Sequence, residues 1–381
     1  MTEKLYYKDA YIKSFSAVVL SVDALGENYG VVLDKTAFFP EEGGQSADKG
    51  KIDSVNVIDV REEGGKIIHL TDAPLEVGKS VECVIDFDER YEKMKCHTAE
   101  HILCGLFHRL YGAENIGFHL GDDAVTFDIS TVLGRDELNY VEDIANGIIS
   151  ENVKVTAAFP TAEELSALSY RAKLDLTENV RIVSIGDYDS CACCAPHVLY
   201  TGEIGLIKML DFCKHRGGIR IYMVAGKRAL SDYRARYAIT QKISALTSTP
   251  QMDIIDAVEQ LQRERNELKL ALKERGFEIA KITAEAVVPT DKNTVHFFDC
   301  LDVDEIREFV NLTVPKVGGM VVALWGDEGD YKFIVGSKAV NLKNVISDIT
   351  LALGGRGGGK SEMVQGSFKA KRSEIEAFFA K

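Results

Sequence analysis

Two short segments of the chain carry side chains that commonly bind metal ions. His97 and His101 lie four residues apart in a segment without glycine or proline, so a helix there would place both imidazoles on one face, one turn apart. Cys193 and His197 repeat this spacing after a predicted strand. Three imidazole nitrogens and one thiolate are suitable ligands for Zn²⁺. The two pairs therefore predict a zinc site, and the spacing favours Cys193 over the adjacent Cys194 as the sulfur ligand.

The first pair also fits other interpretations. His97-x-x-Glu100-His101 matches the pattern of inverzincin proteases, in which Glu100 would be the general base. That interpretation requires a downstream glutamate ligand and leaves Cys193 and His197 unexplained. In a purely structural interpretation, His101 is a half-buried histidine and the cysteines fill apolar space.

Composition excludes several classes of protein. The 381 residues include 45 Lys and Arg and 59 Asp and Glu, a net charge of −14, so the chain cannot bind nucleic acid by overall attraction to phosphate. A local patch is needed, and residues 331–381 provide one, with nine Lys and Arg against four Asp and Glu.

Eight cysteines are too few for a disulfide scaffold. With no apolar run of about 18 residues and no signal peptide, we expect a soluble, cytoplasmic protein that does not bind membranes.

The elements that must position these side chains form an α+β chain of four predicted parts. Alternating apolar residues and turn-forming residues predict a small β-barrel over 1–88, and a zinc-containing α+β domain follows over 89–226. A helix is expected over 88–110, and a second helix begins at Thr161, with apolar residues at Leu165, Leu168 and Leu174. Apolar residues every three or four positions predict a helical hairpin spacer over 227–287, and strands alternating with helices predict an α/β domain over 288–381.

The last domain contains a glycine-rich segment that resembles a nucleotide-binding loop. Residues 354–361 fit the pattern G-x-x-x-x-G-K-S, but a predicted helix over 340–353 precedes them, where such a loop needs a strand. We therefore expect these glycines to let the backbone approach RNA phosphates, with Arg356 and Lys360 adding positive charge.

Several motifs, taken together and in order, resemble a known family. They are Leu33-Asp34-x-Thr36-x-Phe38-Phe39-Pro40-x-x-Gly43-Gly44-Gln45-x-x-Asp48-x-Gly50, then His97-x-x-x-His101, Cys193-x-x-x-His197-Val198, Thr201-Gly202-Glu203-Ile204-Gly205, Arg220-Ile221, Ala225-Gly226, Gly354-Gly355-Arg356-Gly357-Gly358-Gly359-Lys360 and Gln365-Gly366. The first six resemble the editing domain of alanyl-tRNA synthetase and the freestanding AlaX proteins. The last two resemble the C-terminal domain of alanyl-tRNA synthetase, which is related to the accessory domain of DHH phosphodiesterases. The resemblance covers nearly the whole chain, as in the long AlaX form.

This resemblance implies an aminoacyl-tRNA deacylase with a zinc-containing site. Its expected substrate is tRNA(Ala) mischarged with serine or glycine. By analogy, Thr36 would bind the serine hydroxyl, and Gln45 and His101 would position water or substrate. The expected RNA contacts are Arg356, Gly357, Gly358, Gly359 and Lys360. The resemblance also suggests a homodimer formed through the C-terminal domain.

Two points stay open. Relatives usually have Gly-Gly-Thr between the cysteine and the histidine, whereas Cys194, Ala195 and Pro196 stand here, and proline removes a backbone donor. A full shell of four protein ligands is typical of structural zinc, whereas catalysis needs an open position. A non-catalytic tRNA-binding or dimerisation protein with structural zinc would share the fold and the metal site, so only deacylation distinguishes it.

Overall fold

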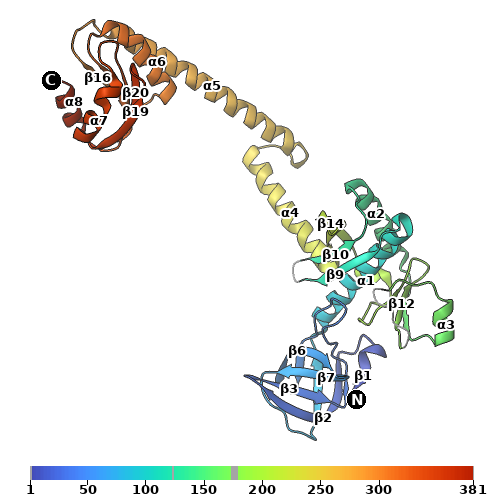
Figure 1. The fold of residues 1–381 in the computed structure, drawn as a ribbon. Helices are drawn as coiled ribbons and strands as arrows, with labels where there is room; N and C mark the ends of the chain where they lie inside the picture. The colour runs from blue at the N-terminus through green and yellow to red at the C-terminus, as the bar shows by residue number, and fades with distance from the viewer. Residues whose placement is uncertain (1, 122–123, 173–178, 381) are drawn as a thin grey trace. The chain divides into compact units, whose positions relative to one another are not determined.

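The computed structural model describes residues 2–121, 124–172 and 179–380 (Figure 1). It divides into two compact units, Met1–Ile239 and Thr240–Lys381. Helices and strands are mixed in both units, which confirms the expected α+β composition. Along the described ranges, no helix is long and apolar enough to span a bilayer.

The first unit begins with a closed six-stranded barrel in the order β2-β3-β7-β6-β5-β8, so the predicted N-terminal barrel is confirmed. Its strands are β2 (Ser14–Leu25), β3 (Asn28–Leu33), β5 (Gly50–Ile52), β6 (Val55–Glu63), β7 (Lys66–Thr71) and β8 (Ser80–Ile85). In β8 exposed and buried residues alternate strictly, as the period of a strand requires, so Val81, Cys83 and Ile85 face the barrel core. Beside the barrel, the short strands β1 (Glu3–Lys4) and β4 (Lys35–Thr36) pair in parallel, and a 3-10 helix η1 covers Leu5–Tyr7.

The glycine-rich loop at 37–49 is fixed to the first long helix, α1 (Phe87–Tyr111). Asp48 accepts hydrogen bonds from the fully buried Arg90 of α1 and from the Phe39 amide, the latter at 2.6 Å. Lys93, also on α1, donates to the Ala47 carbonyl at 2.7 Å. The Asp48–Arg90 pair therefore fixes the position of the loop next to α1, and removing either partner would leave a buried charge uncompensated, at a cost of about 3 to 5 kcal/mol.

Helix α1 matches the predicted helix to within one residue at each end. The Asp86 side chain accepts the Glu89 amide at its start, and Gly112 ends it in the left-handed region with φ of 63°. Around α1 lie a four-stranded sheet, β14-β15-β10-β9, and a three-stranded sheet, β11-β12-β13. Their strands and the neighbouring helices are β9 (Asn115–Leu120), β10 (Val125–Ile129), α2 (Arg135–Glu151), β11 (Val155–Ala158), α3 (Ala162–Ala167), β12 (Ile182–Ile185), β13 (Asp189–Ala192), η2 (Thr201–Ile204), β14 (Ile207–His215) and β15 (Gly218–Ala225).

The helix predicted after Thr161 is present but short. Thr161 and Glu164 form a capping box, and α3 already ends at its C-cap, Leu168. Leu174, the third apolar residue of the predicted helix, lies outside the described residues. This helix buries no residue, so little packing stabilises it beyond its cap.

Two long helices, α4 (Gly226–Thr247) and α5 (Ile254–Ala286), cover the predicted spacer, with a 3-10 helix, η3 (Gln251–Asp253), between them. The division between the two compact units falls inside α4. Whether the two helices pack as a hairpin, and the division of the chain into four domains, stay predictions.

The second unit contains a five-stranded sheet in the order β16-β17-β18-β20-β19. Its elements are β16 (Thr294–Phe298), α6 (Val303–Thr313), η4 (Val314–Lys316), β17 (Val321–Trp325), β18 (Tyr331–Gly336), α7 (Leu342–Ala352), β19 (Gly355–Gly359), β20 (Met363–Phe368) and α8 (Arg372–Phe379). The predicted alternation of strands and helices is present, and the helix predicted over 340–353 is α7. The glycine-rich segment forms the edge strand β19 after a helix, so it is not a nucleotide-binding loop.

Candidate metal centre and its cavity

The first two candidate ligands lie on one face of α1. His97 and His101 are one turn apart and only 3% and 2% exposed. The helix is well formed here because this stretch of α1 is buried on nearly all sides, from Cys96 to Phe107. Their ring centroids are 5.3 Å apart, which leaves both imidazoles able to reach one ion.

The other two candidate ligands lie on the loop that follows β13. Arg181 fixes this loop, because its Nη1 donates to the Cys193 carbonyl at 2.9 Å and to the Ala195 carbonyl at 2.8 Å. Burial lowers the pKa of Arg181. Arg181 side-chain donors therefore hold two carbonyls of the loop that contains Cys193 and Ala195.

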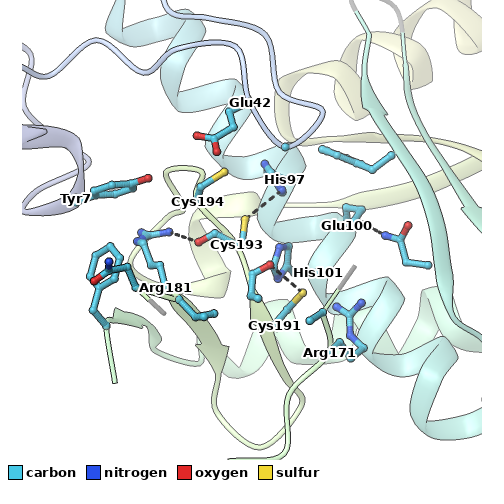
Figure 2. Close-up of a pocket in the computed structure, with 18 of the residues that line it drawn as sticks. Tyr7, Glu42, His97, Glu100, His101, Arg171, Arg181, Cys191, Cys193 and Cys194 are labelled. Carbon is cyan, nitrogen blue, oxygen red and sulfur yellow. Dashed lines mark hydrogen bonds between the residues drawn. The ribbon is translucent and has the colours of Figure 1, made fainter. Parts of the chain in front are cut away.

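The two segments converge, as predicted. One ligand atom from each of His97, His101, Cys193 and His197 lies within 4.8 Å of the others. Cys193 Sγ is 3.6 Å from His97 Nε2, a contact drawn in Figure 2. The same sulfur is 3.3 Å from His197 Nε2. Tetrahedral bonds of about 2.3 Å to sulfur and about 2.05 Å to nitrogen would separate these atoms by about 3.6 Å. The donor set therefore fits Zn²⁺ with little rearrangement around Cys193.

Hydrogen bonds outside this group orient the three imidazoles. The Nδ1 atoms contact Gln45 Oε1 at 2.9 Å for His97, Asp189 Oδ2 at 3.2 Å for His101 and Thr98 Oγ1 at 3.0 Å for His197. An amide oxygen and a carboxylate only accept hydrogen bonds, so His97 and His101 donate through Nδ1. This tautomer leaves the Nε2 lone pair for a metal, the arrangement that outer partners of zinc-bound histidines enforce.

Thr98 fixes the tautomer of His197 by the same logic. Its one hydroxyl proton is donated to the Met94 carbonyl at 2.8 Å. The Thr98 oxygen must therefore accept the other two bonds, from His197 Nδ1 and from the Val198 amide at 3.3 Å. Thr98 thus ties the ligand loop to α1.

Burial sets the protonation of the candidate ligands in the absence of metal. Burial, aided by the neighbouring imidazoles of His101 and His97, lowers the pKa of His197 well below its ordinary value of 6.5, so the ring is neutral and able to coordinate. Burial also raises the pKa of the Cys193 thiol. A metal ion would displace that thiol proton, which makes metal binding pH-dependent.

Asp189 connects the ligand His101 to Arg171. The Arg171 guanidinium donates to both carboxylate oxygens, at 2.7 and 2.8 Å. Burial opposes ionisation of Asp189, but hydrogen bonds from His101 and Arg171 outweigh it and hold the pKa of Asp189 below its usual value. Asp189 is therefore a carboxylate that supports His101 as a ligand.

A cavity of about 400 Å³ opens beside the centre and is lined by His97, His101 and Cys193. Tyr7, Phe159 and Arg181 line one end of the cavity. Glu100 and Asn115 line the other end. Figure 2 shows Tyr7 and Arg181 on one side of the candidate ligands and Glu100 on the other. This volume suits a small ligand.

The remaining residues predicted for the site lie in different surroundings. Gln45 and Thr36 are both fully buried, and neither is among the residues that line the cavity, although Gln45 is hydrogen-bonded to His97, which does line it. Burial lowers the pKa of His69 to about 4, and its Nδ1 donates to the Val31 carbonyl at 3.0 Å, so its Nε2 accepts from the Thr36 hydroxyl at 2.8 Å. The Thr36 proton is thus committed to His69.

Cys194 and Glu100 line the cavity but do not belong to the converging group of candidate ligands. Cys194 lies close to Gly43 of the glycine-rich loop, where a Cβ atom would come within 3.3 Å of its sulfur. The inverzincin pattern also fails here, because the side chains that join His97 and His101 are those of Cys193 and His197.

The predicted RNA contacts lie on the sheet edge of the second unit. All five residues of β19 are exposed, and Arg356, Gly357 and Gly358 line a cleft together with Trp325, Lys332 and Gln365. The backbones of β19 and β20 pack closely, because a Cβ at Gly366 would lie 2.1 Å from the Arg356 carbonyl oxygen. The cleft therefore offers two cations, one indole and glycine backbone on a single surface.

Sequence reasoning missed Thr98, Arg171, Arg181 and Asp189. Asp189 lies 88 positions from His101 in the chain, and Arg181 acts through loop carbonyls, so no local spacing points to either residue. Thr98 had a weak signal in the sequence, since it precedes the candidate ligand His101 by three positions, and residues three apart on a helix are neighbours.

Three parts of the chain match described families. Residues 2–89 match the family of tRNA synthetases class II (A), residues 180–222 the threonyl and alanyl tRNA synthetase second additional domain, and residues 291–381 the DHHA1 domain.

Relatives match over almost the whole chain. The alanyl-tRNA editing protein AlaX-L of Pyrococcus horikoshii is 28% identical, with 98% of this chain and 96% of that protein covered. The alanyl-tRNA editing protein Aarsd1 of Danio rerio is 26% identical, covering 97% and 95%. The alanine–tRNA ligase of Halorubrum lacusprofundi is 32% identical, and this chain spans 42% of its length. Among solved structures, the C-Ala domain of Aquifex aeolicus alanyl-tRNA synthetase is 25% identical over 24% of this chain and 90% of that one, with a TM-score of 0.21.

Proposed function

Because the chain belongs to the family of alanyl-tRNA editing proteins, in the long AlaX form, we propose that it hydrolyses the ester bond between serine and tRNA(Ala), with the glycyl ester as a second substrate. The observation that supports this most directly is the convergence of His97, His101, Cys193 and His197 beside a cavity. A cavity of about 400 Å³ is large enough for an aminoacyl group and part of the terminal nucleoside.

Zn²⁺ is the ion that this donor set fits best, and when bound by all four side chains it would hold α1 and the ligand loop together and place a positive charge beside the cavity. The ester of an aminoacyl-tRNA is already activated, so the remaining work is positioning and stabilisation of the developing negative charge. Gln45 suits such a role. Its Oε1 holds His97, which lines the cavity, whereas Gln45 itself is fully buried and is not among the lining residues, so it would act on the substrate by orienting His97.

The aromatic end of the cavity suits the terminal adenine of tRNA. The rings of Tyr7 and Phe159 are 5.3 Å apart, and the Arg181 guanidinium lies 5.5 Å from the centre of the Tyr7 ring. Bases of single-stranded RNA stack on such aromatic and guanidinium surfaces, gaining about 1 to 3 kcal/mol per base. With adenine there, the ester would extend toward the candidate metal ligands.

Thr36 remains our proposal for the residue that distinguishes serine from alanine. Hydrogen bonding to a substrate hydroxyl in a buried site is the effective way to reject an analogue without it. Since the Thr36 proton is donated to His69, contact with serine would require the substrate to replace that bond. Thr36→Val is expected to reduce hydrolysis of the seryl ester while leaving the glycyl ester, which has no hydroxyl, unaffected.

For the second unit, we propose that the β19 edge binds tRNA through Arg356, Lys360 and the backbone of Gly357, Gly358 and Gly359. Exposed glycine backbone and nearby cations are suited to phosphate contacts, which position RNA without reading its sequence.

The test is deacylation of Ser-tRNA(Ala), Gly-tRNA(Ala) and Ala-tRNA(Ala) by the zinc-loaded full chain. We expect hydrolysis of the seryl and glycyl esters, slow hydrolysis of the alanyl ester, and loss of activity in His97→Ala. A protein that holds zinc and binds tRNA(Ala) but hydrolyses none of the three would instead be a non-catalytic binding module.

A further inference from the structure

Besides His97 and His101, helix α1 presents one more ionisable side chain beside the candidate ligands, that of Glu100. Glu100 follows His97 by three positions and precedes His101 by one, is 3% exposed and lines the cavity. Residues three apart on a helix are neighbours, so the Glu100 carboxylate lies beside the candidate centre (Figure 2).

One oxygen of Glu100 is held and the other is not. Oε1 accepts hydrogen bonds from Asn115 Nδ2 and, at 3.2 Å, from Cys104 Sγ. Asn115 is itself oriented, since its Oδ1 accepts the Gly117 amide at 3.0 Å. Oε2 makes no hydrogen bond within residues 2–121, 124–172 and 179–380. The carboxylate is thus held rigidly with one free acceptor.

The free acceptor also has no cationic partner among the described residues. Arg171, which also lines the cavity, directs its Nε and Nη2 to the two oxygens of Asp189. Burying a carboxylate without a cation is costly, so a ligand that brings a cation to Oε2 would be bound strongly. A positively charged ligand group in the cavity could therefore pair with Glu100.

We propose that Glu100 binds the α-ammonium group of the aminoacyl ester, an inference that rests on the proposed deacylase function. The ammonium nitrogen is separated from the ester carbonyl carbon by a single carbon atom. Holding it at Glu100 would therefore place the carbonyl beside His97 and His101 while the adenine lies at the Tyr7 end. The consequence is a specificity: the cavity accepts esters with a free amino group and excludes N-acylated esters, including peptidyl-tRNA.

The proposal is tested by binding rather than by turnover alone. The probes are two non-hydrolysable adenosine derivatives, one with serine joined by an amide to the 3′ position and one with glyceric acid in its place, which replaces the ammonium by a hydroxyl. Their dissociation constants are measured by calorimetry on the zinc-loaded full chain. Wild type should bind the seryl compound about 30-fold more tightly or better, the ratio expected for a buried charge pair.

Three variants make the result specific. Glu100→Gln keeps the shape and the Oε1 acceptor, so it should fold and should lose about 30-fold in affinity for the seryl compound only. Glu100→Asp keeps the charge and should retain part of the preference. Glu89→Gln, on the same helix and paired with Lys93 outside the cavity, should bind both compounds like wild type.

Several results would overturn the inference. One is an equal loss of affinity for both compounds in Glu100→Gln, another is an unchanged preference, and a third is loss of zinc from that variant, which would make Glu100 a metal ligand. If wild type hydrolyses Ser-tRNA(Ala) while Glu100→Gln retains the preference, the inference fails and the proposed function stands. If wild type neither hydrolyses that ester nor binds the seryl compound, both fail.

Discussion

Replacing Thr98 by valine should weaken zinc binding although Thr98 contacts no metal. The Thr98 oxygen accepts from His197 Nδ1 at 3.0 Å and from the Val198 amide at 3.3 Å, and its hydroxyl donates to the Met94 carbonyl at 2.8 Å. Valine has the same shape but leaves two buried donors without an acceptor, at about 1 to 3 kcal/mol each. Without this acceptor, the His197 tautomer and ring orientation are no longer fixed.

The expected size follows from other zinc sites. Loss of an outer partner typically weakens metal binding by about 10- to 100-fold. This corresponds to about 1.4 to 2.7 kcal/mol. Competition with a chromophoric zinc chelator at constant pH measures the affinity, and urea unfolding of the metal-free protein measures the stability.

A matched control separates stability from metal binding. Thr71 is also fully buried, and its hydroxyl donates to the Tyr29 carbonyl at 3.2 Å and the Ala73 carbonyl at 2.9 Å in the barrel. Thr71→Val should lower stability and leave zinc affinity unchanged. If Thr98→Val binds zinc as tightly as wild type and Thr71→Val, the tautomer argument is refuted.

Three further predictions concern the ligand loop, the sheet around α1 and the second unit. Cys193→Ser should lose zinc and Cys194→Ser should keep it, as measured by metal content after dialysis. The reverse pattern would show that Cys194, not Cys193, is the sulfur ligand. Hydrogen bonds from Arg220, at 2.7 and 2.9 Å, hold the pKa of Asp128 below 3.8, so the pair stabilises the fold fully above about pH 4 and loses this effect as pH falls further. Asp128→Asn should therefore cost about 1.5 to 3 kcal/mol of unfolding free energy at pH 7 and progressively less as the pH falls below about 4; a cost that does not decrease with falling pH contradicts this assignment. Arg356→Ala should weaken tRNA binding and reduce the slope of log affinity against log salt by about 0.9, and an unchanged slope would remove this residue from the phosphate contacts.

Local patterns were sufficient to predict much of the first unit. Alternation in segments such as 81–85 predicted the barrel, and the absence of glycine and proline between residue 88 and Gly105 predicted α1, which runs from Phe87 to Tyr111. The four candidate ligands could be found because both pairs keep a four-residue spacing. Each of these patterns spans only a few residues, so it can be recognised in the sequence without knowledge of tertiary contacts.

The supporting residues could not be predicted in this way. Asp189, Arg181 and Gln45 act on side chains or carbonyls that are remote in sequence or held only by the fold. The edge strand β19 is another case, because glycine has little tendency to form strands and pairing with β20 decides its structure. The inverzincin pattern would make Glu100 a general base, but that pattern does not hold, and the role that we propose for Glu100 rests on its hydrogen bonds.

X-ray absorption at the zinc edge of the purified full chain tests the central claim most directly. We expect one zinc per chain with one sulfur at about 2.3 Å and three nitrogens at about 2.0 to 2.1 Å, and loss of the sulfur shell in Cys193→Ser. A shell of nitrogen and oxygen atoms alone, or two sulfur neighbours, would contradict the assignment of His97, His101, Cys193 and His197 as the ligands.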